Sequence, residues 1–552
     1  SQAQKYRSSG KLELAMESYQ EAAKSYQGYL ERFPHDKQLY ELTFYMAECL
    51  YYSTQFLDAA MAYTEVRDAR DDRKYRNDSA LSVVLSYEKE ALFAVKRGEL
   101  DSFEVKGSSD RIEGESIKPR DIPSPRKNLI DASDTYDKVV KASDDNLPGI
   151  LYKAAEVFYG YDHFEEARRR FLEILKRFPG HETSVYASNL IIESYLSEKN
   201  FQAVEDFTRE LLDLKAGAVA QRGAFQGNLL KFKTGAMFKR AEKLAEKGDL
   251  EDASDLYVQL VNENPKAQFA DLALNNAAVG YEKVKRYDSA SKLYERIVKE
   301  YPRSSLADTA LFRVALNAER FFNFDKAIST YKQLIKNYPK SESRPDAVYN
   351  GALALENTQQ YSASAVLYER YCKLFPNRDD APEVCFRAGA VYEKMNDLKR
   401  VVSTYQNFAK KYNSNTSHRD RITEAYLRIA KAYEKMGKER DAIKYFRKTV
   451  DEVAKTGDEK SAPYGAEAQF ELVERRFKSF SDLVITGSVK QQKKGLVKKL
   501  EALKAVEVSY KQILKFKQLD WTLASLFRIG ALYQNVAETF VNAPCPREIK
   551  QS

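Results

Sequence analysis

The chain repeats one short pattern at a constant interval, and this interval constrains its fold more than any other feature. Residues 324–339 read FDKAISTYKQLIKNYP, and similar lines begin at residues 287 and 361. Each line opens on an aromatic residue and closes on an aromatic–Pro pair. Three columns recur every 37 residues: Pro265, Pro302, Pro339 and Pro376; Tyr257, Tyr294, Tyr331, Tyr368 and Tyr405; Ala253, Ala290 and Ala327. Such a repeat indicates an array of stacked units, because one unit alone cannot bury its apolar face.

Each copy contains two helical patterns separated by a short break. Residues 306–322 place apolar side chains at three- and four-residue spacing, which predicts an amphipathic helix. Asn and Asp then mark a new helix start, and the second helix is expected to run from about Lys326 to Tyr338, before Pro339. Small residues are expected where the two helices touch, in a column with the same period: Ala278, Ala315, Ala352 and Gly389.

The order of small, aromatic and Pro residues resembles the tetratricopeptide repeat, with its slots filled by Ala278, Tyr281, Ala290, Tyr294 and Pro302. The resemblance implies an all-α solenoid of about twelve antiparallel helix hairpins. Three extra residues lengthen the link between repeats. The phrase YPKSESRPDAVYNGALAL is similar to tetratricopeptide proteins of bacterial envelopes, namely the BAM-complex outer-membrane lipoproteins and the periplasmic Tol-Pal coordinator.

Changes in composition divide the chain into five segments. Residues 99–127 are rich in Gly, Ser, Pro and charge, which predicts a flexible loop inserted between helices. Residues 479–495 are expected to form a smaller insertion. The predicted organisation is tetratricopeptide-like hairpins in 1–98, the inserted loop in 99–127, further hairpins in 128–220, a regular array in 221–455 and longer, capping helices in 456–552.

The bulk composition is that of a folded, water-soluble chain. Of its 552 residues, 43% are hydrophobic and 31% charged, and the net charge of +8 is spread along the length. This distribution argues against nucleic acid as a partner, because a nucleic-acid-binding protein concentrates its basic residues. The four Cys show no paired spacing, and burial as small apolar side chains explains Cys49, Cys372 and Cys385. No apolar run is long enough to span a bilayer.

No motif for catalysis, cofactor binding or metal binding is found in the sequence. There is no glycine-rich phosphate loop, no nucleophile elbow, and no cluster of His and Cys at metal-ligand spacing. His163, beside Glu165 and Glu166, is interpreted as part of a hairpin turn. We therefore expect a non-enzymatic protein without a cofactor.

The resemblance implies that the first helices of the repeats line a concave groove, so residues on their outward positions are the candidate binding site. One column holds Phe312, Tyr349 and Phe386; a second holds Leu316 and Leu353; a third holds Glu319, Glu356 and Glu393. The aromatic column either forms an exposed apolar groove or is buried against a neighbouring repeat, and the glutamates either meet a ligand or form a solvated face. Tetratricopeptide domains that hold a terminal carboxylate use Lys and Asn in the first two columns. Here Asn275 begins the first column, but aromatic and aliphatic residues fill its other slots and the second column, so a clamp for a terminal carboxylate is not supported.

These patterns favour a scaffold that binds a protein or peptide segment, and the envelope resemblance implies a periplasmic or outer-membrane-associated location. The chain begins at Ser1, so we expect a trimmed segment whose leader or lipid anchor has been removed. Peripheral membrane association would then depend on that anchor or on a partner. A cytosolic adaptor or chaperone-like regulator, and the repeat region of a larger protein, are the alternatives. The sequence does not determine the oligomeric state.

Overall fold

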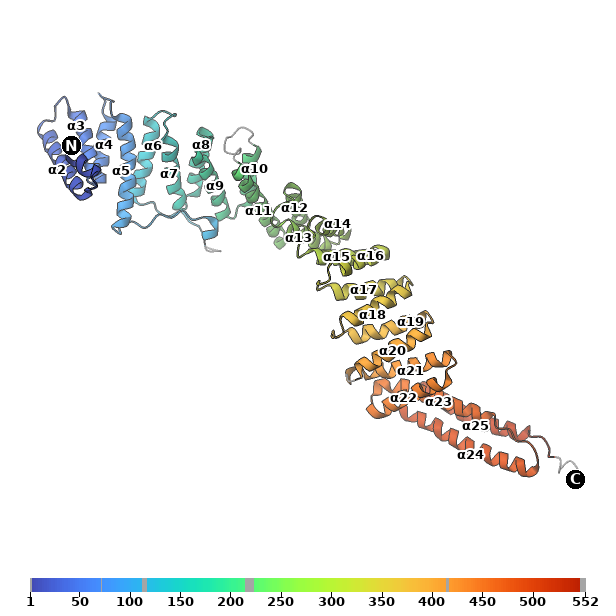
Figure 1. The fold of residues 1–552 in the computed structure, drawn as a ribbon. Helices are drawn as coiled ribbons and strands as arrows, with labels where there is room; N and C mark the ends of the chain where they lie inside the picture. Colours follow the sequence, from blue (N-terminus) through green and yellow to red (C-terminus); the bar gives the residue numbers. More distant parts are fainter. Residues whose placement is uncertain (1, 71, 112–116, 214–222, 414–415, 547–552) are drawn as a thin grey trace. The chain divides into compact units, whose positions relative to one another are not determined.

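The computed structural model describes residues 2–70, 72–111, 117–213, 223–413 and 416–546, and these residues form 25 α-helices and no β-strand (Figure 1). Successive helices pack against each other as antiparallel hairpins. The predicted all-helical solenoid is confirmed. The chain divides into two compact units, residues 1–285 and 286–552, and this division falls within the segment 221–455 that the sequence predicts as one regular array.

The first unit contains thirteen of these helices within its described residues, with lengths from 7 to 25 residues. They are α1 (Gln2–Ser8), α2 (Leu12–Arg32), α3 (Leu39–Tyr52), α4 (Phe56–Asp68), α5 (Arg76–Lys96), α6 (Ser124–Val139), α7 (Leu147–Gly160), α8 (Phe164–Arg177), α9 (Glu182–Ser197), α10 (Phe201–Asp213), α11 (Gly223–Lys247), α12 (Leu250–Glu263) and α13 (Ala270–Lys283).

The second unit begins with the most regular part of the array and ends with two long helices. Its helices within the described residues are α14 (Tyr287–Glu300), α15 (Ala307–Arg320), α16 (Phe324–Asn337), α17 (Arg344–Asn357), α18 (Tyr361–Leu374), α19 (Ala381–Lys394), α20 (Leu398–Tyr412), α21 (Arg419–Lys435), α22 (Glu439–Thr456), α23 (Ala462–Ser481), α24 (Val489–Ile513) and α25 (Leu519–Val541). The smaller insertion predicted at 479–495 is reduced to the link between α23 and α24.

Each hairpin turn uses the same backbone conformation. A residue just after the first helix has positive φ, and the next amide donates back across the turn, as Asn323 does to the carbonyl of Ala318 at 2.9 Å. Asn323 then caps α16 through its side chain, which accepts from the amide of Lys326. The positive-φ turn residues that are not glycine are Thr54, Asp162, Lys199, Lys285, Phe322, Gln359 and Asn396.

The predicted column of small residues lies at the contact between the two helices of a hairpin. Ala315 and Ala352 are fully buried, and the carbonyl of Ala352 accepts from the Ser364 hydroxyl at 2.8 Å. At Gly389 the Tyr405 ring occupies the space where a side chain would begin. Close approach of the two helices therefore depends on small side chains in this column, as predicted.

Candidate functional site

The eight residues assigned to the groove lie on three first helices of the second unit, α15, α17 and α19. In the aromatic column, Phe312 and Tyr349 are half-buried. Their ring centroids lie 5.9 Å from that of Tyr331 and 6.2 Å from that of Tyr368, each on the second helix of the same hairpin. One side of each aromatic ring thus packs within the hairpin, and only part of its surface is available to a ligand.

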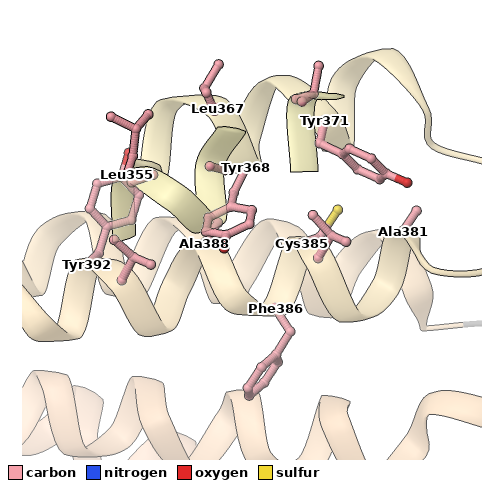
Figure 2. Close-up of a cluster of buried hydrophobic side chains, with 14 of the residues drawn as sticks. Leu355, Leu367, Tyr368, Tyr371, Ala381, Cys385, Phe386, Ala388 and Tyr392 are labelled. Carbon is pink, nitrogen blue, oxygen red and sulfur yellow. The ribbon is translucent and has the colours of Figure 1, made fainter. Parts of the chain in front are cut away.

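The third aromatic residue, Phe386, departs from the expected exposed column. Its side chain is 5% exposed and packs against Tyr405 and Phe408 of α20, with ring centroids 5.0 and 5.5 Å away. Figure 2 shows Phe386 leaving α19 on the side opposite Tyr368. The Arg421 guanidinium from α21 lies over the ring at 5.0 Å. The second helix of its own hairpin and an arginine of the next repeat therefore cover Phe386, so of the two alternatives for the aromatic column, burial holds at this position.

Leu316 and Leu353 occupy the second column, on α15 and α17. Both are half-buried, so part of each side chain is open to solvent. Together with the exposed parts of Phe312 and Tyr349 they form the apolar portion of the candidate groove. This portion spans two repeats rather than three.

In the third column, Glu356 bonds to the buried tyrosine of its repeat and to the next repeat. Glu356 is only 7% exposed and accepts from the Tyr368 hydroxyl at 3.0 Å. It also accepts from Arg387 Nε at 2.9 Å and Lys394 Nζ at 2.8 Å, both on α19 of the following repeat. The expectation that Glu356 stands on an open rim is therefore wrong, because it joins two repeats inside the array.

A ladder of ion pairs between successive first helices was missed from the sequence. Glu393 of α19 pairs with Arg428 Nη1 of α21 at 2.7 Å, and Lys431 of α21 pairs with Glu467 of α23. Each pair joins one repeat to the next. Arg313 and Arg387 lie two 37-residue periods apart. This spacing is the signal in the sequence that could have indicated a basic column beside the glutamates.

The three glutamates differ in their pKa because their surroundings differ. Burial raises the pKa of Glu319, although a hydrogen bond from Tyr331 opposes this. Burial also raises the pKa of Glu393, partly offset by Arg428. For Glu356, burial acts in the same direction, but the bonds from Lys394 and Arg387, with that from Tyr368, lower its pKa below the ordinary value. Only Glu356 is held firmly as a carboxylate.

A second candidate surface lies in the first unit, where the segment inserted between α5 and α6 packs against α7, α8 and α9. We call its described residues, 101–111 and 117–122, the strap (Figure 1). The sequence predicts a flexible loop here. Instead, the strap is ordered without helix or strand apart from one short 3₁₀ turn at Ser108–Asp110, its backbone is extended at Gly107 and Arg111, and α6 begins at Ser124.

Two charged contacts hold the strap to the turn between α7 and α8. Arg111 Nη2 and Arg120 Nε lie 2.8 and 2.9 Å from the carboxylate of Asp162, whose side chain is 9% exposed. The amide of Arg120 donates to the carbonyl of Tyr161 at 2.9 Å. Salt bridges of this partly buried kind are stronger than surface pairs.

The rest of the strap is fixed by an aromatic side chain and by its backbone. Phe103 packs over Gly160, where the absence of a side chain leaves room for the ring. The Tyr159 hydroxyl donates to the carbonyl of Lys106 at 2.9 Å. The amide of Ser108 donates to Glu193 of α9 at 2.7 Å. These contacts reach 53 to 85 residues along the chain, so local composition gives no sign of them.

The strap contacts the positions that correspond to the candidate groove. Glu193 lies eight residues before Phe201, which opens α10, just as Leu316 lies eight residues before Phe324, which opens α16. Tyr159 lies five residues before Phe164, which opens α8, just as Glu319 lies five residues before Phe324. Both belong to the columns assigned to the inner face. The first unit therefore shows how these columns hold an extended segment: its backbone bonds to side chains of the first helices.

The cysteines also differ from expectation. Cys372 of α18 and Cys385 of α19 form a disulfide, with Cα atoms 5.6 Å apart, rather than serving as separate apolar side chains. Cys49 is a free, buried thiol and Cys545 a free, exposed one. Among the residues that the structure describes, no group of His, Cys, Asp and Glu could hold a metal ion. No helix in the described ranges is long and apolar enough to cross a membrane.

Comparison with known proteins identifies the repeat. A family model described as tetratricopeptide repeat matches residues 309–341 and 424–456, which cover most of α15 and α16 and of α21 and α22. No match is found among curated proteins.

Several solved structures resemble parts of the chain. The C-terminal part of a TPR repeat-containing protein from Cytophaga hutchinsonii is 17% identical, covers 52% of this chain and 99% of its own, and gives a TM-score of 0.31. A tetratricopeptide repeat protein from Parabacteroides merdae is 11% identical, covers 55% and 98%, and gives 0.26. The TPR2AB domain of yeast Sti1, in a complex with pHSP90, is 15% identical, covers 55% and 98%, and gives 0.24.

Proposed function

We propose that this chain, which is built from tetratricopeptide repeats, is a non-enzymatic scaffold that holds an extended segment of a partner protein against its first helices. Repeats of this fold generally serve as surfaces for protein–protein interaction. The specific surface is the inner face of α15 and α17, with Leu316 and Leu353 at its centre. The partner contributes apolar side chains and its own backbone polar groups.

The strap is the observation that carries this proposal. It is an extended segment, and it lies on the inner-face positions Tyr159 and Glu193 in the first unit. In the second unit the corresponding positions are Glu319 and Leu316, which keep part of their surface exposed. A partner segment at this surface would use the geometry that the chain already uses for its own strap.

The charges of the second unit determine what kind of segment fits. Glu356 and Glu393 are already paired with arginine and lysine of the next repeat. A partner's basic residues would have to compete with these pairs, so we assign most of the affinity to apolar anchors. We therefore place the partner's apolar side chains against Leu316 and Leu353, and its basic residues contribute little.

We further propose that the scaffold works in a bacterial envelope, in the periplasm or at the outer membrane. The disulfide between Cys372 and Cys385 supports this, because such bonds persist in oxidising compartments and are rare in the cytosol. Titrating thiols in the protein isolated from its own cell tests the location. Two free thiols in the denatured, unreduced protein are expected. Four would favour the cytosolic adaptor instead.

Photo-crosslinking in the native cell tests the binding surface. A photoreactive amino acid at position 353 should capture a partner, whereas the same group at exposed Val366, on the second helix α18, should not. In the presence of Leu316→Asp, capture from position 353 should be lost while the melting temperature stays near that of the wild type, because Leu316 is half-buried.

Two outcomes would contradict the proposed surface. Equal capture from positions 353 and 366 would show that the first helices have no special role. Undiminished capture in the Leu316→Asp background would show that the partner sits elsewhere on the array.

A further inference from the structure

The last helix of the array, α25, exposes apolar side chains on the face that points away from the core. Its inner face packs through Leu532 and Ser525, which are fully buried. On the outer face, seven large apolar side chains are each at least half exposed: Leu519, Leu523, Leu526, Phe527, Tyr533, Phe540 and Val541. A helix that is apolar on both faces is normally buried on both.

The neighbouring helix α24 carries many more charged residues than α25, although it also exposes Val497, Leu500 and Val508. Residues 489–517 contain nine Lys and two Glu. Only Asp520, Arg528 and Glu538 are charged on α25, and Arg528 is directed inward to Glu474, 2.6 Å away. Contiguous exposed apolar surface of this kind marks a site that a partner covers. The outer face of α25 is therefore a candidate interaction surface.

The outer residues of α25 follow the spacing of a helix-packing seam. Positions 519, 523, 526, 530, 533, 537 and 540 alternate steps of four and three residues. Gly530 stands at the centre, and a side chain there would meet nothing within 4 Å. Glycine in the middle of a helix costs about 1 kcal/mol relative to alanine. No contact with the residues that the structure describes accounts for this cost, whereas the close approach of a second helix would.

We propose that α25 is a dimerisation helix, and that two copies of this chain pack α25 against α25 in antiparallel orientation with Gly530 at the crossing point. Apolar positions lie on both sides of Gly530. Phe527 would face Tyr533 of the second copy, and Leu523 would face Ala537 of the second copy. A two-fold contact of this kind needs only one self-complementary surface.

The size of the apolar face of α25 agrees with a second copy of this chain as its partner. Seven large side chains, half or more exposed, offer on the order of 700 Å², close to what one partner contributes to a standard protein interface. A lipid surface fits less well, because exposed Asp520 and Glu538 border the apolar face and anionic lipid repels them. The antiparallel pair places Glu538 opposite Thr522 of the second copy, so like charges do not meet.

Sedimentation equilibrium of the chain from residue 1 to 552 tests the dimer. The wild type should be a dimer at micromolar concentration. Leu523→Asp with Phe527→Asp should weaken dimerisation by about tenfold or more, with an unchanged helical spectrum and melting temperature. Val366→Asp, a matched exposed apolar site on α18, should leave the dimer intact. A wild type that is monomeric throughout would overturn the proposal, whether or not it binds vesicles of anionic phospholipid.

Cysteine crosslinking tests the antiparallel register independently. In a Cys545→Ser background, Gly530→Cys should form a disulfide-linked dimer on mild oxidation. Leu519→Cys and Val541→Cys should crosslink when mixed, and little when either is alone. Strong crosslinking of Leu519→Cys to itself would indicate a parallel pair and would contradict the proposed geometry.

Discussion

At the residue scale, the turns of the array contain a backbone conformation that their side chains do not favour. Phe322 has φ of 57° and its side chain is 81% exposed, so little packing compensates for the left-handed conformation. The corresponding turn after α21 uses Gly437, with φ of 72°. Glycine adopts this region without the steric conflict that a Cβ atom creates.

We predict that Phe322→Gly raises the free energy of unfolding by about 0.5 kcal/mol, because relief of the left-handed conformation exceeds the added entropy of the unfolded chain. Chemical denaturation measures the change. Phe321→Gly is the control: its φ is −95°, so there is no conflict to relieve, and the substitution should lower stability. Equal effects of the two changes would show that the turn conformation is not the cause.

Two glutamates of the same column should respond to pH in opposite ways. The pKa of Glu356 is lowered, so its contribution is complete above about pH 5 and is lost as the pH falls through the folded pKa. We expect Glu356→Gln to lose about 1–3 kcal/mol at neutral pH, because it weakens the bonds of a buried carboxylate to two partly exposed cationic partners, Arg387 and Lys394. The loss should shrink in acid.

Glu319 provides the matched comparison. Its pKa is raised by burial, so the charged form costs stability at neutral pH. Glu319→Gln should gain roughly 0.5 kcal/mol there, and the gain should vanish as the pH falls through the raised folded pKa and the carboxyl becomes neutral. Thermal melts of both variants between neutral and acid pH check the signs. A loss of stability in both at neutral pH would contradict the difference in environment.

The sequence predicts the buried columns of this array well and the exposed ones poorly. The burial of Ala315 and Tyr331 follows from the 37-residue period, because every repeat must pack the same way. Phe386 has the same register as Phe312 but is buried, because Phe408 of its own hairpin and Arg421 of the following repeat both cover its ring. Exposure depends on neighbours outside the repeat, so a column of like residues does not establish a common surface.

At the scale of elements, the strap shows how far composition can mislead. Gly, Ser, Pro and charged residues predict a flexible loop, yet Phe103 and Arg120 are held by the turn between α7 and α8. The disulfide between α18 and α19 was missed for a similar reason. Contacts between residues distant in sequence decide both, and a single sequence does not reveal them.

We predict that trypsin cleaves slowly after Lys106 in the folded protein. Asp162→Asn, which keeps the turn but removes the charge, should speed this cleavage roughly tenfold, because local release of the strap becomes easier. Lys199→Asn, at the same turn position one repeat later, is the control and should have no effect on this site. Rapid cleavage of the wild type after Lys106 would instead restore the interpretation of a flexible loop.

At the scale of the whole molecule, stability is expected to be distributed repeat by repeat. Each hairpin contacts mainly its neighbours in sequence, so unfolding can begin at a weak interface and need not involve the entire array. The ion pairs between first helices and the disulfide between α18 and α19 both act across such interfaces. They link repeats rather than strengthen any single hairpin.

The disulfide gives the sharpest test of this view. Cys372 and Cys385 are separated by 13 residues, and a crosslink that closes a loop of this size is worth about 3 kcal/mol. We predict that Cys372→Ser with Cys385→Ser lowers stability by about this amount and separates denaturant unfolding into two steps, because the array loses its covalent link at one interface. Circular dichroism against denaturant concentration measures both effects. Cys49→Ala, at a buried thiol outside any bond, should shift the first unit's unfolding without adding a step. A single transition with an unchanged midpoint in the double variant would mean that the bond is absent in solution, which would also remove its support for an oxidising compartment.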